Sequence, residues 1–510
     1  MFTLSRREAL GSLAAGLATA AAPPPGRAAA LPPFFDRIER DTFAYFWNTT
    51  NPTNGLAPDR WPSAPLASIA ATGFALTAWP IGATRGWITR EQARARTLAT
   101  LRFFWNAPQG DAPAGTTGHK GFFYHFLDLR HGHRTGQCEL SSIDTTLLLG
   151  GILFAGQWFD DPHPDEREIR DLAARVYARV DWRWMQTRPP RIAMGWHPET
   201  GFIARDWSGY NEAMLLYILA LAAPEHAVGP EAWTAWCATY DANWRGKGPA
   251  RHLAFAPHFG HQYSHVWVDF RRIQDAAMRE AGLDYFDNSR RATYAQRAYA
   301  IANPMGWDGY SADIWGLTAC DGPGRGHVTV RGSERPTRGY SARGPVDFPD
   351  GFDDGTLAPT AAIASLPFAP EIVIPAARAM HALHGTRIYG RHGFVDAFNP
   401  SVRLANTRSR SGLVDPVHGW TAIDRLGIDQ GPILAMIANA RDDLVWRTMR
   451  ASPVIRRGLE RASFSGGWLS STKRLHAVAL DRGSHDHRNS QYTQRLELQE
   501  CAIVGITSFR

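Results

Sequence analysis

The chain has 510 residues, of which 44% are hydrophobic and 20% are charged, so its composition is that of a large globular protein. Its formal net charge of +7 is mild for this length, and no run of lysine or arginine suggests binding to nucleic acid. The four cysteines are widely spaced, without a CxxC or zinc-binding pattern, so we predict no disulfide and no cysteine-based metal site.

Residues 1–30 are predicted to form a signal peptide for export. Arg6 and Arg7 precede a mildly apolar run that ends near Ala22, a pattern typical of a twin-arginine signal. The run is too short and too rich in alanine for a good membrane span. We therefore expect a periplasmic or secreted protein that has no membrane span.

Residues 34–460 are predicted to form one catalytic domain of helical hairpins. Apolar side chains recur at intervals of three and four residues, strand-like alternation is scarce, and Thr89 has the place of a helix cap. The predicted helices cover residues 34–50, 66–83, 89–106, 142–159, 165–181, 212–222, 230–243, 269–281, 287–302, 358–384 and 428–450. An α-solenoid would share this periodicity, but no repeat of fixed length is visible. We therefore expect an all-α fold, an (α/α)6 toroid, with the loops at one end forming a cleft.

Residues 468–510 form a tail that becomes polar along its length. Serine, histidine, arginine and aspartate replace the apolar residues of the preceding segments. We predict that this tail is partly disordered, because it offers too little apolar surface to form a core of its own.

Glu212 enters a predicted apolar helix from an aromatic loop that contains a glycine. The loop reads Asp-Trp-Ser-Gly-Tyr-Asn from residue 206. A carboxyl group among rings suits an acid that protonates a sugar, because rings stack on pyranose faces and a drier environment raises a carboxyl pKa. The alternative is a structural glutamate that the helix dipole favours.

Three further carboxyl groups lie at predicted helix starts. Glu139 and Asp144 flank a turn-to-helix junction and could line one cleft, and Asp429 begins a helix directly from a loop. Each also has a structural interpretation, in which Ser141 or Ser142 caps the first of these helices and Asp429 caps the other. Paired carboxylates among aromatic rings favour glycoside hydrolysis as the chemistry.

The histidines between residues 258 and 269 suggest a metal at first sight, but they are mixed with rings and amides rather than with cysteines or carboxylates in tight spacing. Sugar hydrogen bonding and plain packing are the better interpretations. No nucleotide loop or serine-nucleophile elbow is present, and we predict no metal and no organic cofactor. The candidate substrate-binding residues are Trp207, Tyr210, Asn211, His261, Tyr263, Trp307, Asp313 and Trp315.

Six stretches of the sequence resemble the glycoamylase-like domain family, which contains the endo-β-1,2-glucanases of glycoside hydrolase family 144. It is also related to the glucan-processing domain of cyclic β-1,2-glucan synthases. The stretches are residues 86–92, 209–212, 297–304, 315–319, 358–362 and 428–432. The resemblance implies an (α/α)6 toroid and hydrolysis of β-1,2-linked glucan, with the family's essential glutamate at Glu212. Some relatives carry Asp-Leu-Val-Glu-Thr where this chain reads Ser-Ser-Ile-Asp-Thr from Ser141, so Asp144 replaces the glutamate, and Glu139 could compensate for the missing aspartate.

The sequence thus predicts an exported glycoside hydrolase that cleaves β-glucan, with β-1,2-glucan as the first expected substrate. Glu212 is the predicted general acid and Asp429 the first choice for general base, with Asp144 and Glu139 as its rivals. The resemblance implies inversion, which sets the two carboxyls about 6.5–9.5 Å apart. A transglycosylase, a polysaccharide lyase or epimerase, and a non-catalytic glucan-binding protein are the alternatives. We expect a monomer whose partner is an oligo- or polysaccharide.

Overall fold

The computed structural model describes residues 31–63, 66–348, 350–404 and 411–470. The predicted signal peptide and residues 471–510 of the predicted tail lie outside these ranges. None of the helices in the described ranges is long and apolar enough to cross a membrane.

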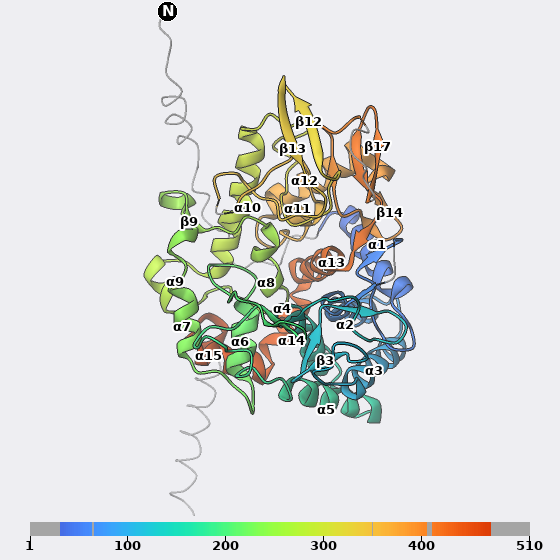
Figure 1. Cartoon of the computed structure of the whole chain (residues 1–510), viewed down its shortest axis with the longest axis vertical. Helices are drawn as coiled ribbons and strands as arrows, with labels where there is room; N and C mark the ends of the chain where they lie inside the picture. Colours follow the sequence, from blue (N-terminus) through green and yellow to red (C-terminus); the bar gives the residue numbers. More distant parts are fainter. Residues whose placement is uncertain (1–30, 64–65, 349, 405–410, 471–510) are drawn as a thin grey trace, which may run out of the picture.

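Six helices of the described chain have side chains buried around most of their circumference. They are α2 (Ile69–Thr84), α4 (Ser142–Trp158), α6 (Met214–Ala222), α8 (Tyr263–Trp267), α11 (Pro359–Ile363) and α13 (Gly427–Asp442). A helix that is apolar on every side is stable only inside protein, and α6, which reads MLLYILALA, has all nine residues buried. Figure 1 shows α13 near the middle of the molecule, where it packs against α1, α2, α8 and α11.

A second set of helices buries one face and exposes the other. It comprises α1 (Pro33–Thr49), α3 (Arg90–Asn106), α5 (Pro164–Ala178), α10 (Tyr285–Ala302), α12 (Pro370–His384) and α15 (Pro453–Arg461). Helix α1 covers α2 and α13, α5 covers α4, α12 covers α11 and α15 covers α6. This inner and outer layering is what the predicted (α/α)6 toroid requires, and the closed ring itself stays a prediction. The remaining α-helices of the described chain are α7 (Glu231–Cys237), α9 (Ala276–Ala281) and α14 (Leu444–Arg450).

The predicted helices are present, but several of their ends were wrong. The cap at Thr89 is confirmed, because its hydroxyl accepts from the backbone N–H of Gln92 while the Gln92 side chain accepts from the N–H of Thr89. The prediction of one helix over 428–450 fails at Asp443, whose φ of 57° ends α13 and begins α14. The predicted helix over 358–384 likewise divides into α11 and α12.

The all-α expectation needs correction, because short antiparallel strands join the loops of the described chain into eight small sheets. The sheets contain β3 (Gly118–His119), β4 (Phe122–Tyr124), β6 (Leu140–Ser141), β7 (Gly195–His197) and β8 (Gly201–Phe202) in the largest; β16 (Phe398–Asn399), β18 (Gly419–Ala422) and β17 (Gly412–Asp415) in the next; and the pairs β1 (Arg60–Trp61) with β19 (Arg425–Leu426), β2 (Leu66–Ser68) with β5 (Phe126–Asp128), β9 (Trp244–Arg245) with β10 (His252–Leu253), β11 (Ile273–Gln274) with β20 (Ser465–Gly466), β12 (Gly326–Val330) with β13 (Ser333–Thr337), and β14 (Tyr389–Gly390) with β15 (Gly393–Phe394). Strands this short serve to fix the loops between helices.

The predicted tail began too early in the sequence. The indole N–H of Trp468 donates to the backbone carbonyl of Asp269 at 2.8 Å, and Leu469 is buried. The start of the segment over 468–510 therefore packs on the body of the protein, because its first residues are still apolar.

Helices α2 and α4 approach each other backbone to backbone. A Cβ atom on Gly151 would lie 1.9 Å from the carbonyl oxygen of Gly73, so neither helix has room for a side chain there. We expect Gly151→Ala to lower the free energy of unfolding by about 1–3 kcal/mol in urea denaturation, because the methyl group forces the helices apart. Gly339→Ala is the control, since nothing lies within 4 Å of its new Cβ. Equal stability of the two variants would contradict the close contact.

Candidate active site

The starts of several buried helices meet in one region, where their side chains bond one another. The hydroxyl of Ser264 in α8 donates to the backbone carbonyl of Glu212, just before α6, at 2.9 Å. The hydroxyl of Tyr263 donates to the carbonyl of Ile428, in the first turn of α13, at 3.2 Å. The positive ends of the α6 and α13 dipoles therefore lie beside the predicted catalytic carboxyls and favour negative charge there.

Glu212 lies in a tight turn that leads into α6. Gly209 has a φ of 71°, a conformation that glycine adopts readily, and the side chain of Asn211 accepts from the N–H of Ala213. Only 8% of Glu212 is exposed, and its Oε2 has no hydrogen-bond partner among the described residues. Burial, with a further contribution from the charge of Asp144, raises the pKa of Glu212 to about 7. The carboxyl group is therefore protonated in weakly acidic solution, as a general acid must be.

Asp144 lies in the first turn of α4, close enough to influence Glu212. The hydroxyl of Ser141 accepts from the N–H of Asp144 and donates to its Oδ2 at 2.6 Å. The structural interpretation of Ser141 as a helix cap is therefore confirmed. Burial raises the pKa of Asp144, and the positive charge of His125 partly offsets that rise.

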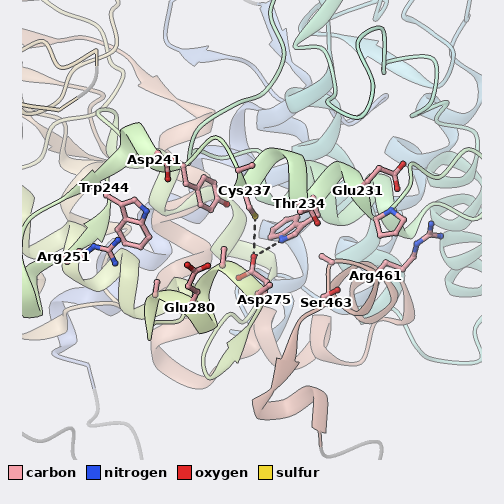
Figure 2. A pocket seen from close by; sticks show the side chains of 18 residues that line it. Glu231, Thr234, Cys237, Asp241, Trp244, Arg251, Asp275, Glu280, Arg461 and Ser463 are labelled. Carbon is pink, nitrogen blue, oxygen red and sulfur yellow. Dashed lines mark hydrogen bonds between the residues drawn. The ribbon is translucent and has the colours of Figure 1, made fainter.

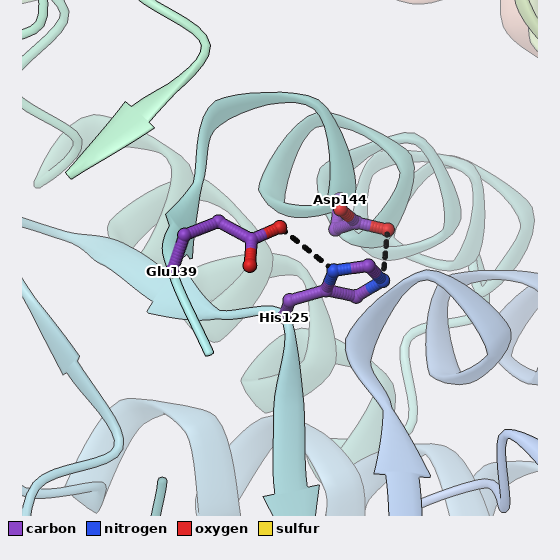
Figure 3. Close-up of side chains that lie close together, drawn as sticks. All are labelled: His125, Glu139 and Asp144. Carbon is purple, nitrogen blue, oxygen red and sulfur yellow. Dashed lines mark hydrogen bonds and ion pairs between the residues drawn. The ribbon is translucent and has the colours of Figure 1, made fainter. Parts of the chain in front are cut away.

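His125 lies between two of the predicted catalytic carboxyls (Figure 3). Its Nδ1 is 2.8 Å from Oε1 of Glu139, and its Nε2 is 3.5 Å from Oδ1 of Asp144. Both carboxyls were predicted from the sequence, but the imidazole between them was not. Glu139 and Asp144 thus belong to one cluster, and they are joined through a third side chain.

Two clusters in the described chain bring ligand-type atoms within 4.8 Å of one another. One is the His125 cluster and the other contains Asp160, Asp161 and Glu166. In the first, each imidazole nitrogen faces a different carboxylate, whereas one metal ion would take a single nitrogen of the ring. In the second, the guanidinium of Arg90 already contacts all three carboxylates, at 2.8–3.2 Å. Both arrangements fit ion pairs between side chains better than they fit a bound metal ion.

Asp429 forms a second carboxyl pair at the start of α13, with Asp396 as its neighbour. The two side chains are within hydrogen-bonding reach, and burial together with the charge of Asp396 raises the pKa of Asp429. Burial and the charge of Asp321 raise the pKa of Asp396 to about 7. Such a pair holds one proton over a wide range of pH and keeps a single negative charge.

Arg60 connects this carboxyl pair to the rest of an acidic cluster. Its guanidinium lies 2.7 Å from Asp321, 3.0 Å from Asp59 and 3.8 Å from Asp424. The N–H of Asp321 in turn donates to Oδ2 of Asp396 at 2.7 Å. One cation thus lies among several carboxylates, and the cluster keeps a net negative charge.

The structure corrects the predicted roles of several substrate-binding residues. Tyr210, His261, Trp307 and Trp315 have at most 1% of their surface exposed, so they offer almost no surface to a sugar. Burial keeps His261 neutral by lowering its pKa far below the ordinary value. These rings lie next to polar residues in the sequence, but they point into the core of the protein.

The other predicted substrate-binding residues have mixed positions. Trp207 is 5% exposed, and its indole N–H donates to the hydroxyl of Ser142 at 2.9 Å. Asn211 and Tyr263 are also largely buried, and their polar atoms bond the backbone that holds the carboxyls. Asp313 is exposed. The binding of sugar by these four residues stays a prediction.

A pocket of about 930 Å³ lies in another part of the molecule, between α7 and α9 (Figure 2). Trp233, Tyr240 and Trp244 line it together with Asp275 and Glu280. None of the predicted catalytic residues takes part in its wall. The carboxylate of Asp275 already accepts hydrogen bonds from the indole N–H of Trp233 and the hydroxyl of Tyr285, and it caps α9.

Comparison with known proteins supports the chemistry that the carboxyls suggest. Residues 204–453 match the family model described as "Putative glucoamylase", a range that contains Glu212, Asp396 and Asp429. A curated relative, an exo-β-1,2-glucooligosaccharide sophorohydrolase acting at the non-reducing end, from Parabacteroides distasonis, is 27% identical over 458 residues. That match covers 84% of this chain, but the chain spans only 57% of the relative.

Two solved structures resemble this one over most of its length. A protein of Bacteroides uniformis described as a putative glucoamylase has a TM-score of 0.73 and 28% identity, with 85% of this chain and 98% of that chain covered. An endo-β-1,2-glucanase of Chitinophaga pinensis, solved with sophorotriose and glucose, has a TM-score of 0.72 and 26% identity, with 86% and 100% covered. These similarities support the predicted class, glycoside hydrolase. The predicted resemblance to the glycoamylase-like domain family, with its β-1,2-glucan hydrolases, is confirmed.

Proposed function

We propose that this protein hydrolyses β-1,2-linked glucan with inversion, at a site built on the loops of an (α/α)6 toroid. The observation that carries the proposal is the carboxyl group of Glu212, which is buried, has a pKa raised to about 7 and lies near a second carboxyl group. The relatives that act on β-1,2-linked glucose chains supply the substrate class. Export through the predicted signal peptide to the periplasm or the medium, and a monomeric state, are part of the same proposal.

Glu212 is the general acid of the proposed reaction and gives its proton to the departing glycosidic oxygen, either directly or through a substrate hydroxyl. Asp429 is the general base that accepts a proton from the attacking water. The pair that it forms with Asp396 keeps one negative charge while sharing one proton, an arrangement that aspartic proteases also use to activate water. Asp144 contributes a charge that helps to keep the proton on Glu212.

The proposal is tested by incubating the purified protein with β-1,2-, β-1,3- and β-1,4-glucans and measuring new reducing ends. We expect release from β-1,2-glucan alone, and NMR of fresh digests should show the α-anomer first, because inversion of a β-linkage produces it. Product lengths over time separate endo from exo cleavage. A first product in the β-configuration would contradict inversion.

The alternatives give other results in the same experiment. Longer oligosaccharides formed at the expense of reducing ends would indicate a transglycosylase, and ultraviolet absorption by a new double bond would indicate a lyase. Retention of glucan without cleavage would leave a binding protein. Asp429→Asn and Asp144→Asn identify the base when azide is added, because azide can attack in place of water without a general base. We expect azide to restore cleavage by Asp429→Asn. If azide restores cleavage by Asp144→Asn alone, Asp144 is the base.

A further inference from the structure

The side chain of His125 is held on three sides. Its ring stacks on that of Phe126, with 3.8 Å between centroids and 16° between planes. One ring nitrogen lies 2.8 Å from Glu139 and the other 3.5 Å from Asp144. In the described part of the chain, the ion-pair partners of the ring are these two carboxylates, and they lie at its opposite ends, as Figure 3 shows.

Backbone hydrogen bonds hold His125 and Glu139 side by side. Tyr124 pairs with Leu140 in the β4–β6 ladder, and the N–H of His125 donates to the carbonyl of Glu139 at 3.0 Å. The carbonyl of His125 accepts from the N–H of Ile69, the first residue of α2. The backbone of His125 is thus bonded to the start of α2 and to the residue before β6. Its ring contacts α4 through Asp144.

Among the described residues, the charged groups that act most strongly on His125 are acidic. Burial by itself would lower the pKa of His125, but Asp144, Glu139 and Asp59 outweigh it and raise the pKa to about 9. Burial by itself would raise the pKa of Glu139, but the hydrogen bond and the positive charge of His125, with a smaller contribution from His197, together lower it. The ring is therefore an imidazolium at neutral pH.

We infer that His125 is a positioning residue, a positively charged bridge that ties Glu139 to Asp144 and keeps Asp144 ionised beside Glu212. The inference rests on the proposed function for its catalytic consequence. Glu139 hydrogen-bonds the ring at 2.8 Å, so its place in the site is to orient and charge His125. The charge retained on Asp144 then helps Glu212 to hold the proton that it donates.

The charge on the bridge can be measured without any activity. Histidine labelled with ¹⁵N is followed by NMR through a pH titration, and the His125 signals are assigned as those that His125→Gln removes. We expect the imidazolium to persist to about pH 9 in the wild type and to titrate at lower pH in Glu139→Gln. A wild-type pKa near the ordinary value of about 6.5 would overturn the inference. Stoichiometric zinc that displaces the His125 proton signals would also overturn it, in favour of a metal site.

The catalytic consequence is measured by pH profiles of β-1,2-glucan hydrolysis. We expect His125→Gln to lower kcat about 10- to 100-fold with little change in KM. Without the ring, the carboxyl of Asp144 is no longer held in its position beside Glu212. Without the imidazolium the pKa of Asp144 rises, and Asp144 takes up a proton. Glu212 then loses the negative charge beside it, so the basic limb of the profile should move to lower pH. His125→Lys returns a positive charge and should restore part of that shift.

His131→Gln is the matched control. His131 lies in the same hairpin region and its Nδ1 is 3.0 Å from Asp128, but both side chains are exposed. It should leave kcat and the pH profile unchanged. If His125→Gln also leaves them unchanged, the bridge has no positioning role. If no glucan is cleaved by the wild type, the proposed function fails, while the NMR titration still decides whether the bridge is charged.

Discussion

Replacing Glu212 with glutamine is expected to lower kcat for β-1,2-glucan hydrolysis about 10²- to 10⁴-fold, the usual contribution of a general acid. Glutamine keeps the size of the side chain but has no proton to transfer, so KM should change little. The wild-type rate should fall as the pH rises through about 7, where Glu212 loses its proton. Reducing-end assays across pH measure both effects.

Stability provides a second measurement on the same variant. A carboxyl whose pKa is raised from 4.5 to about 7 on folding costs free energy once the pH exceeds the unfolded value. Glu212→Gln should therefore unfold at a higher denaturant concentration than the wild type at pH 8, and the ionic part of this difference should vanish below pH 4. Asp171→Asn, which alters an exposed pair on α5, is the control for both measurements. Near-normal turnover by Glu212→Gln would end the assignment of the acid.

Replacing Arg343 with methionine is expected to lower the free energy of unfolding by about 3–5 kcal/mol. Arg343 and Asp354 have no exposed side-chain surface, and two nitrogens of the guanidinium lie 2.7 and 2.9 Å from the carboxylate oxygens. The same guanidinium donates to the carbonyls of Cys320 and Gly339. Removal of the cation leaves a buried negative charge and two carbonyls without these donors.

An exposed pair of the same geometry is the control for this prediction. Arg102 contacts Glu168 through two hydrogen bonds of 2.7 and 2.6 Å, but both side chains are exposed. Arg102→Met should cost about 1 kcal/mol or less, because water already solvates both charges. Adding Asp354→Leu to Arg343→Met should recover part of the loss. Equal losses at the two arginines in denaturant unfolding would refute the argument from burial.

The helices could be predicted from the sequence because the signal for a helix is local. Apolar spacing and a cap such as Thr89 lie within a few residues of one another, and the layered helices appear where they were predicted. The break at Asp443 was missed because an aspartate with positive φ has no distinctive sequence pattern. The two-residue strands were missed because they are too short to show alternation, and some of them, such as β1 with β19, also pair across a long stretch of the chain.

The candidate site was predictable only in part, for the same physical reason. Glu212, Asp144 and Asp429 each begin a helix, and that position is visible in a single stretch of sequence. His125 and Asp396 have partners that the fold brings to them. Pairing of β4 with β6 places Glu139 beside His125, and Asp396, in the loop between β15 and β16, lies beside Asp429 at the start of α13. The buried rings show the opposite error, since aromatic residues beside polar ones suggested a surface where the structure has a core.

The pairing of β1 with β19 has a consequence for how the chain is made. Helix α2, whose sides are nearly all apolar, finds one of its main neighbours in α13, and β1 finds its partner just ahead of α13. During translation α2 is synthesised long before α13, so part of its apolar surface stays exposed until α13 is made. Structures dominated by such distant contacts fold slowly and are exposed to aggregation during that wait. We therefore expect the first helices of this protein to need protection from aggregation until the last ones emerge.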